Sequence, residues 1–368
     1  MSTKKSSKSS KLDSPLPIDP ELLEAHRHPV LDALDHWKEN GKIPPVLMLS
    51  GPRGCGKRDI AFFIAQTLQC ENSGLSDSPP SLFGGSVDPG VGRPRPCGEC
   101  GPCLRNLSGQ SLDFKEITLA ADSSTLKIDQ FREMKETMGF SSFDGSYRIF
   151  LITDAEKMTV QAANSLLKLL EEPPEGWIFL LTVSDPALLP STVVSRCQIL
   201  RLRPLPESVL RPMLERREIP ADRIEIATLL GEGSLSRALE IAEDEAWEMR
   251  STLMRFLVLP QSVFHELIDY AASDSANFRM MLDSFELILN DLVIHAKEPA
   301  ASFRNFDAKS VITEHQKLCV LRKGGLDAAQ AFWIERAERL FRMRREITVP
   351  LNQKVLATDF LSPWLDAV

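Results

Sequence analysis

The chain has 368 residues and a formal net charge of −8; 43% of the residues are hydrophobic and 26% are charged. These values are typical of a soluble globular protein of two or three domains, and the acidic balance argues against a surface covered in DNA-binding side chains. No apolar stretch reaches membrane-spanning length and no signal peptide is present, so we expect a cytoplasmic protein without a membrane partner. Residues 1–24 begin with a Ser- and Lys-rich stretch and are expected to form a disordered tail.

Residues 25–205 alternate predicted strands and helices. A helix with one apolar face is predicted over 28–40, and the buried strand 46–49 follows it. In chain order, the other predicted elements are helix 58–69, strand 114–117, helix 128–138, strand 148–152, helix 159–170, strand 177–183 and strand 198–202. This alternation predicts an α/β domain with a parallel sheet and a ligand site at the carboxyl edge of its strands.

Only helices are predicted after residue 205. Three short ones form a small lid domain over 206–257, at 207–217, 223–230 and 236–243. Longer amphipathic segments form an all-helical domain over 258–368, at 263–272, 277–296, 309–321, 328–342 and 350–360. The apolar faces of these segments suit either a collar that packs against other subunits or a core that closes on itself.

A phosphate-binding loop with an altered metal position follows the strand 46–49. Gly51, Gly54, Gly56 and Lys57 fit the G-x-x-x-x-G-K pattern, in which backbone N–H groups and the lysine approach phosphates. The next position normally carries a hydroxyl that binds Mg²⁺, but here it is Arg58, whose guanidinium has no acceptor for a metal. The loop therefore predicts nucleotide binding that is weak or absent.

The second nucleotide motif is altered in the same way. In a working ATPase the strand 148–152 would be followed by an Asp for Mg²⁺ and a Glu that orients water. This chain has Thr153 at the first position and Asp154 at the second. Two lesions beside one metal position favour a nucleotide-binding fold that no longer hydrolyses ATP; the alternative is a degraded loop that only shapes the start of a helix.

A cluster of cysteines lies near an insertion rich in Gly, Ser and Pro at 71–96. Cys97, Cys100 and Cys103 form C-x₂-C-x₂-C, and Cys70 can supply a fourth thiolate from the end of the preceding helix. Four cysteines predict a closed, structural Zn²⁺ site over 70–103. An iron–sulfur cluster is the alternative. The spacer between Cys70 and Cys97 makes Cys70 the weakest member of the set.

Three further motifs give the chain a family resemblance. Residues 164–174 read NSLLKLLEEPP, residues 181–186 read LTVSDP, and residues 189–197 read LPSTVVSRC. With the cysteine module, these resemble the AAA+ subunits of bacterial DNA polymerase III clamp loaders. The resemblance covers about 28–240 and implies an AAA+ P-loop domain, a helical lid and a helical collar.

Within that family the lesions are similar to those of delta-prime subunits. These commonly carry Gly-Lys-Arg in the loop and Thr-Asp-Ala in the second motif, whereas gamma/tau motor subunits have intact residues. This chain has Gly56-Lys57-Arg58 and Thr153-Asp154-Ala155. The spacing before Arg237 in residues 233–239 also resembles delta-prime.

The resemblance implies a role inside a ring of subunits that helps load the sliding clamp onto primer–template DNA during replication. It implies gamma/tau and delta subunits as partners, in a nucleoid-associated replisome. Arg196 of Ser-Arg-Cys would act in trans on the nucleotide of a neighbouring motor; the alternative is a local pair with Glu171 or Glu172. Ser184 would contact a phosphate or cap a strand, and Arg237 would touch nucleotide or be a solvated helix arginine.

The chain itself is expected to have neither polymerase nor ATPase activity. Two other functions stay open from the sequence. One is an active ATP-hydrolysing motor of the gamma/tau type, which Arg58 and Thr153 disfavour. The other is a zinc-containing protein that binds DNA alone, which the net charge of −8 disfavours.

Overall fold

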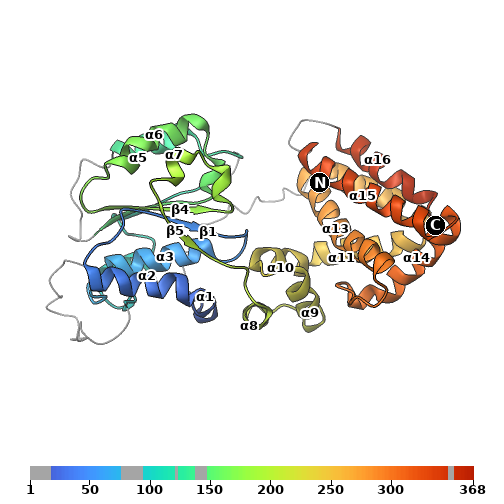
Figure 1. The fold of residues 1–368 in the computed structure, drawn as a ribbon, viewed down its shortest axis with the longest axis horizontal. Coiled ribbons are helices and arrows are strands. Elements are labelled where there is room, and N and C mark those ends of the chain that lie inside the picture. Colours follow the sequence, from blue (N-terminus) through green and yellow to red (C-terminus); the bar gives the residue numbers. More distant parts are fainter. Residues whose placement is uncertain (1–17, 76–93, 121–122, 137–146, 347–351) are drawn as a thin grey trace, which may run out of the picture. The chain divides into compact units, whose positions relative to one another are not determined.

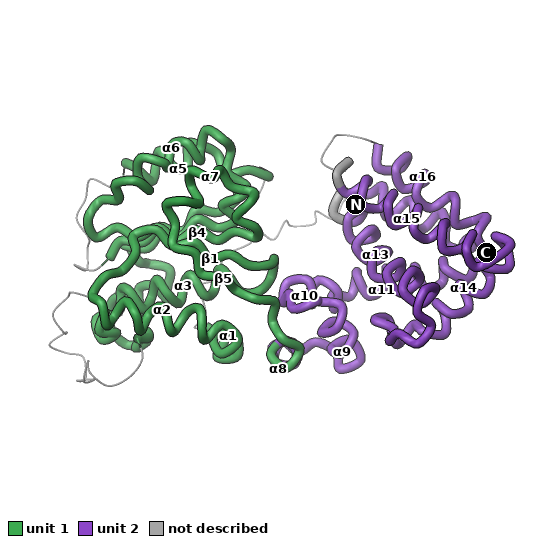
Figure 2. Tube along the Cα trace, in the orientation of Figure 1, with its two compact units in different colours: residues 1–209 green, residues 210–368 purple. Residues whose placement is uncertain are grey.

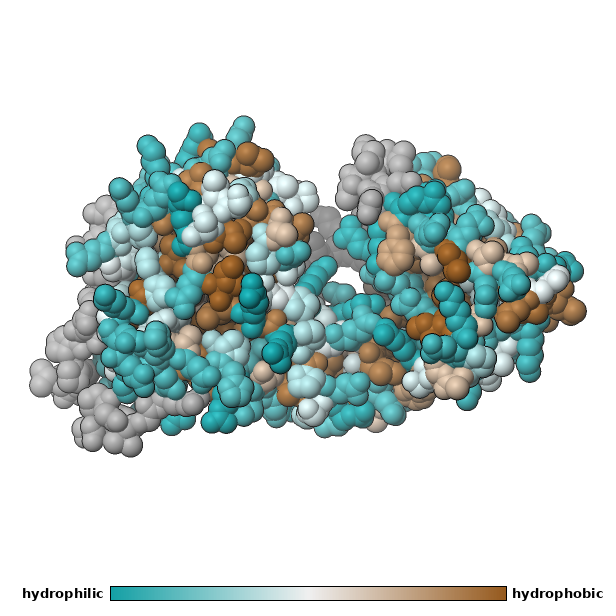
Figure 3. Space-filling model, viewed as in Figure 1, coloured by the Kyte–Doolittle hydropathy of each residue, from teal (hydrophilic) through white to brown (hydrophobic). Residues whose placement is uncertain are grey.

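The computed structural model describes residues 18–75, 94–120, 123–136, 147–346 and 352–368. The chain divides into two compact units, Met1–Val209 and Leu210–Val368 (Figure 2). Figure 3 shows apolar side chains scattered among hydrophilic ones on the visible face of each unit. Each unit has its own arrangement of elements.

The first unit is built on a five-stranded parallel sheet with the order β2-β3-β4-β1-β5. The strands are β1 (Val46–Ser50), β2 (Phe114–Ile117), β3 (Arg148–Ile152), β4 (Trp177–Val183) and β5 (Gln198–Arg201). Every residue of β1 and β4 is buried, as expected for a parallel sheet covered on both faces. The predicted α/β fold with a parallel sheet is confirmed, with β5 ending one residue earlier than predicted.

Helices cover both faces of this sheet. Figure 1 shows α2 and α3 on one face and α5, α6 and α7 on the other. The helices of this unit are α1 (Pro20–Ala25), α2 (Arg27–Asn40), α3 (Lys57–Gln69), α4 (Gly101–Leu107), α5 (Ile128–Glu136), α6 (Val160–Glu171) and α7 (Ser191–Val194); α8 (Glu207–Glu215) leads into the second unit. The side chain of Thr159 caps α6 by accepting a hydrogen bond from the backbone N–H of Ala162 at 3.2 Å.

The prediction that residues 1–24 form a disordered tail is wrong for its last residues. α1 begins at Pro20 with Asp19 as its N-cap, and Leu22 is only 2% exposed. The apolar Leu22 side chain therefore anchors this short helix to the domain. Residues 1–17 of the predicted tail, and 76–93 of the predicted insertion, lie outside the described residues.

The second unit is helical in its described part, which confirms the predicted helical C-terminal region. Its helices are α9 (Ala221–Leu230), α10 (Leu235–Ala242), α11 (Asp244–Val258), α12 (Pro260–Ser273), α13 (Ser275–Lys297), α14 (Lys309–Lys323), α15 (Leu326–Glu346) and α16 (Gln353–Leu365). Three buried side chains, Phe285, Phe360 and Trp364, make edge or tilted ring contacts at the centre of its core.

His315 is a buried histidine at the centre of this helical core. Its Nδ1 lies 2.7 Å from the carbonyl oxygen of Leu257, and the indole N–H of Trp333 donates to its Nε2 at 3.3 Å. Burial lowers the pKa of His315 from 6.5 to about 4. Between these two pH values the unfolded chain binds a proton that the folded chain does not, so stability falls as the pH falls.

We therefore expect His315 to lower the unfolding free energy by about 2 kcal/mol between pH 7.5 and pH 5. A His315→Gln variant keeps a donor and an acceptor but does not titrate, so it should lack this part of the loss. Denaturant unfolding at both pH values measures the difference, with the exposed His28 changed to Gln as the control. Equal losses in wild type and His315→Gln would contradict the expectation.

Candidate nucleotide and metal sites

The phosphate-binding loop connects β1 to α3 at the carboxyl edge of the sheet. Gly54 and Gly56 have φ values of 74° and 87°, in the left-handed region that glycine adopts without strain. A Cβ at Gly56 would also lie 2.4 Å from Cδ1 of Leu22, so that side chain would have to shift. At Gly51 a Cβ would lie 2.6 Å from the carbonyl oxygen of Leu202. The loop thus has the backbone of a phosphate cradle, packed closely against its own chain.

Lys57, the predicted phosphate lysine, is folded back onto this loop. Its ammonium group donates to the carbonyl oxygens of Gly51 and Pro52, both at 2.8 Å, and the residue is 8% exposed. In this arrangement its charge is satisfied by backbone carbonyls of the loop.

Arg58 fills the position of the metal-binding hydroxyl with an ion pair. Its Nε and Nη2 donate to the two carboxylate oxygens of Glu116 at 2.5 and 2.6 Å. This is the bidentate geometry of a strong Arg–carboxylate pair, and the hydrogen bonds to Glu116 raise the pKa of Arg58. Glu116 belongs to β2 and was not a predicted site residue. Only the fold brings it to Arg58, since 58 residues separate the two.

The second altered motif follows β3. The hydroxyl of Thr153 donates to the carbonyl oxygen of Ile117 at 3.2 Å, and so ties the end of β3 to β2. Asp154 has a φ of 49°, its N–H donates to Thr182 Oγ1 at 3.1 Å, and its carboxylate pairs with Lys157 at 3.0 Å. Neither side chain is arranged as a ligand for Mg²⁺ in these contacts.

Ser184, the predicted phosphate or capping residue at the end of β4, is held by a carboxylate. Both its N–H, at 3.0 Å, and its hydroxyl donate to Oε1 of Glu156. Glu156 Oε2 is buried with no hydrogen-bond partner in the described part of the chain. The contact agrees with the capping role and engages the hydroxyl that a phosphate would need.

Arg196, the predicted trans-acting arginine, follows α7 and pairs with a local carboxylate. Its Nη2 donates to Oε1 of Glu171 at 2.5 Å, and its Nη1 donates to the carbonyl oxygen of Thr192 at 2.6 Å. Of the two carboxylates that the sequence offered, the structure selects Glu171. The Arg196 side chain remains 31% exposed.

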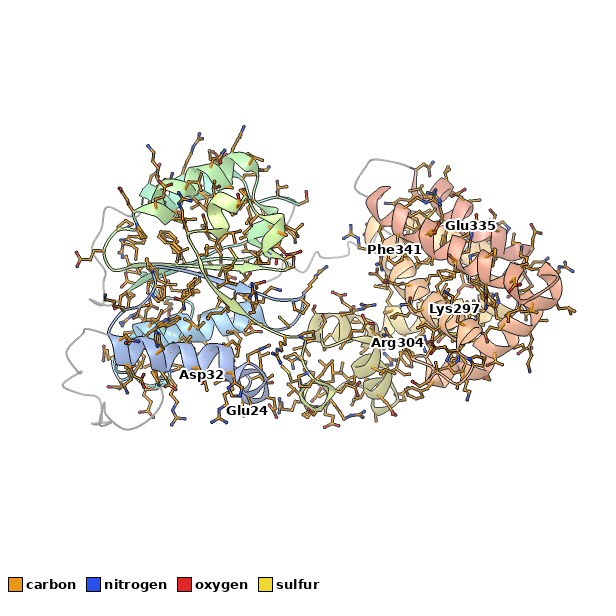
Figure 4. The ribbon with its side chains drawn as sticks, viewed as in Figure 1. Glu24, Asp32, Lys297, Arg304, Glu335 and Phe341 are labelled. Atoms are coloured by element: carbon orange, nitrogen blue, oxygen red, sulfur yellow. The ribbon has the colours of Figure 1, made fainter. Side chains whose placement is uncertain are left out.

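Arg237, the predicted lid arginine, lies near the start of α10 in the second unit. It pairs with Glu232 at 3.0 Å and more distantly with Glu286 of α13 at 3.9 Å. Glu232 also pairs with Arg304, which Figure 4 labels, and Glu286 pairs with Arg344 at 2.7 Å. Arg237 is therefore part of an ion-pair network that joins α10 to α13.

The four cysteines of the predicted metal site come together. Their sulfur atoms all lie within 4.8 Å of one another, and those of Cys70 and Cys100 are 3.9 Å apart. Cys70, the weakest candidate from its spacing, follows the last turn of α3 and joins the others. The backbone N–H of Cys97 donates to Cys70 Sγ, and that of Cys100 donates to Cys97 Sγ, both at 3.3 Å.

This arrangement fits a tetrahedral thiolate site. Zinc–sulfur bonds of about 2.3 Å place tetrahedral sulfurs roughly 3.8 Å apart, close to the observed separation. Hydrogen bonding with Cys103 and Cys70 lowers the pKa of Cys100, whereas hydrogen bonding with Cys100 raises the pKa values of Cys70 and Cys103. The cluster can hold a metal ion with all four positions closed by protein ligands.

Cys55 is buried and Cys197 is half-buried, and both behave as ordinary thiols. Burial raises the pKa of Cys55, and it raises that of Cys197 to about 12. Neither belongs to the four-cysteine cluster.

In the described residues, none of the helices is both long and apolar enough to cross a bilayer.

A phosphate-binding loop after β1, which lies between β4 and β5 of a parallel sheet, defines a P-loop protein of the predicted AAA+ fold class. Residues 27–206 match the family model described as DNA polymerase III, delta subunit. The tau subunit of DNA polymerase III from Bacillus subtilis (strain 168) is 25% identical over 267 residues, covering 70% of this chain and 43% of tau. The tau subunit from Escherichia coli (strain K12) is 32% identical over 220 residues, covering 58% of this chain and 31% of tau.

Among solved structures, a DNA polymerase III gamma subunit-related protein from Thermotoga maritima has 17% identity and a TM-score of 0.45, covering 91% of this chain and 99% of its own. The matches to the two tau subunits span less than two thirds of those proteins' length. The sequence matches show that residues 27–206 are similar to a DNA polymerase III delta-subunit domain and that the chain is similar to tau subunits of DNA polymerase III.

Proposed function

We propose that this chain is a delta-prime-type subunit of the DNA polymerase III clamp loader, which helps load the sliding clamp onto primed DNA but does not itself hydrolyse ATP. Its partners would be gamma/tau and delta subunits, with the clamp and primer–template DNA reached through the complex. It would work in the cytoplasm, at the nucleoid-associated replisome. ATP or ADP would bind weakly or not at all in its own loop.

The Arg58–Glu116 pair is the observation that carries this proposal. A hydrolysing P-loop site needs Mg²⁺ at that position to neutralise charge on the transferring phosphoryl group. Here both oxygens of Glu116 are committed to Arg58, and the hydroxyl of Thr153 is committed to a backbone carbonyl. The two sides of the metal position are thus filled by bonds within the chain.

Arg196 supplies the positive part of the proposed function. A partly exposed arginine just after a short helix can reach across an interface to the phosphates of a neighbour's nucleotide. The chain would then complete an active site that belongs to an adjacent motor subunit.

Zinc would have a structural role in this chain. Bound by Cys70, Cys97, Cys100 and Cys103, it would join the end of α3 to α4 and leave no coordination position for catalysis.

The absence of hydrolysis is tested on the purified chain alone. We expect Mg²⁺-ATP turnover no higher than that of a buffer blank, because Arg58 and Thr153 stand where a working site has its Mg²⁺ ligands. Phosphate release measures it, with the reconstituted loader as the positive control. Turnover by the chain alone that Lys57→Ala abolishes would make the chain a gamma/tau-type motor and overturn the proposal.

A further inference from the structure

The ion pair between Arg196 and Glu171 joins the end of α6 to the turn that follows α7, and these two helices contact each other in the first unit. Glu171 is the last residue of α6, and Arg196 lies just beyond α7. Hydrogen bonds hold the guanidinium on two sides. Nη2 donates to Glu171, and Nη1 donates to Thr192 and, at 3.3 Å, to Ser195. The direction of the Arg196 side chain is therefore set before any partner binds.

The contacts of Arg196 leave part of its hydrogen-bonding capacity for a ligand. A guanidinium has five N–H groups. Nε is buried without a hydrogen-bond partner in the described residues, so its N–H is not exposed to a ligand. The second N–H of Nη2 has no partner among the described contacts, and the side chain is 31% exposed. The chain therefore holds one edge of the guanidinium, and part of its positive charge remains accessible to a ligand.

Helix stability alone does not account for a carboxylate at the position of Glu171. The C-terminal end of a helix carries partial negative charge, so an anionic side chain there is unfavourable unless a cation compensates it. Arg196 provides that cation at 2.5 Å. The neighbouring Glu172 has the same charge at the same helix end, without this contact.

We infer that Glu171 is a positioning residue for Arg196: its carboxylate holds the guanidinium in the orientation in which it acts on the neighbour's nucleotide. This inference rests on the proposed trans-acting role of Arg196. Arginine keeps its charge when paired, so Glu171 orients the group without removing its ability to stabilise phosphoryl charge. The entropy cost of orienting the guanidinium is then met when the chain folds and not during the reaction.

The test uses the loader reconstituted with its motor and delta subunits on primed DNA with the clamp. Glu171→Ala in this chain should lower kcat for ATP at the affected site by roughly 10-fold and leave KM for ATP unchanged, because misplacement of a catalytic group affects the reaction step. Glu172→Ala removes a carboxylate at the same helix end and should leave kcat unchanged. In an Arg196→Ala background, Glu171→Ala should have no further effect.

The outcomes separate the two proposals. If Arg196→Ala lowers kcat while Glu171→Ala does not, or raises it, the positioning role is overturned and the trans-acting role stands. If Arg196→Ala leaves kcat unchanged, both fall. A thermal midpoint for Glu171→Ala within about 2 °C of wild type excludes misfolding as the cause. If the variant does unfold, Glu171→Met keeps the side-chain length without a hydrogen-bond acceptor for Arg196 and should give the same loss of kcat with a native midpoint; unchanged kcat in that variant would overturn the positioning role.

Discussion

Replacing Arg196 with alanine is expected to remove hydrolysis at one ATP site of the reconstituted loader. An arginine supplied across an interface stabilises charge on the transferring phosphoryl group, and its loss costs ~10³-fold or more in rate in well-studied cases. Pre-steady-state phosphate release on primed DNA counts the sites that hydrolyse in the first cycle. The amplitude that belongs to one site should disappear, while the other sites keep their rate.

A matched control is available on the same unit. Arg201 is an exposed arginine at the end of β5, so Arg201→Ala removes the same charge from a nearby strand. We expect it to leave the amplitude unchanged. An unchanged amplitude of phosphate release with Arg196→Ala would contradict the trans-acting role and leave Arg196 as a partner of Glu171 only. An equal loss with both variants would point to general electrostatic weakening of the complex rather than to a specific contact.

The sheet could be predicted from the sequence because its strands are continuous apolar runs. Residues 148–152 and 177–183 were predicted with the bounds that the structure has. Continuous apolar runs of this length are typical of parallel strands that are buried on both faces. The P-loop was recognised for a similar reason, since its glycines are needed where the backbone has positive φ.

Other elements were missed, for different reasons. α11 lies outside the predicted helices, although its buried residues Ala246, Met249, Leu253 and Phe256 recur at helical spacing and indicate a helix. α4 has only seven residues and begins with Gly101-Pro102, which reads as a turn. Its helix forms beside the gathered cysteines, and a local pattern does not record that.

The partners of the site residues could not be predicted from local patterns. Glu116 meets Arg58 only because β2 ends at the edge of the sheet where α3 begins, and no spacing rule connects them. For Arg196, the sequence offered Glu171 and Glu172 equally, since both precede the same prolines. Their different positions at the end of α6 decide which one reaches the guanidinium. Long-range pairs of this kind depend on register and helix packing.

Replacing Cys70 with serine is expected to abolish stable metal binding by the full-length chain. A thiolate zinc site of four ligands contributes on the order of 10 kcal/mol to the structure it holds, and a serine hydroxyl does not replace a thiolate. Elemental analysis should find about one zinc per wild-type chain and far less in Cys70→Ser. Because the metal would join α3 to α4, limited proteolysis should cut the variant within residues 94–107 faster than wild type.

The control for this change is Cys55→Ala, which removes a buried thiol that lies outside the cluster and should keep its zinc. Full zinc content in Cys70→Ser would show that Cys97, Cys100 and Cys103 bind without it, and that the close approach of Cys70 is packing alone. If the wild-type protein contained iron and sulfide and absorbed visible light, the same four thiolates would hold an iron–sulfur cluster and not zinc. Because the cluster includes Cys70 across the long spacer, metal binding also tests whether this module closes as one unit with α3.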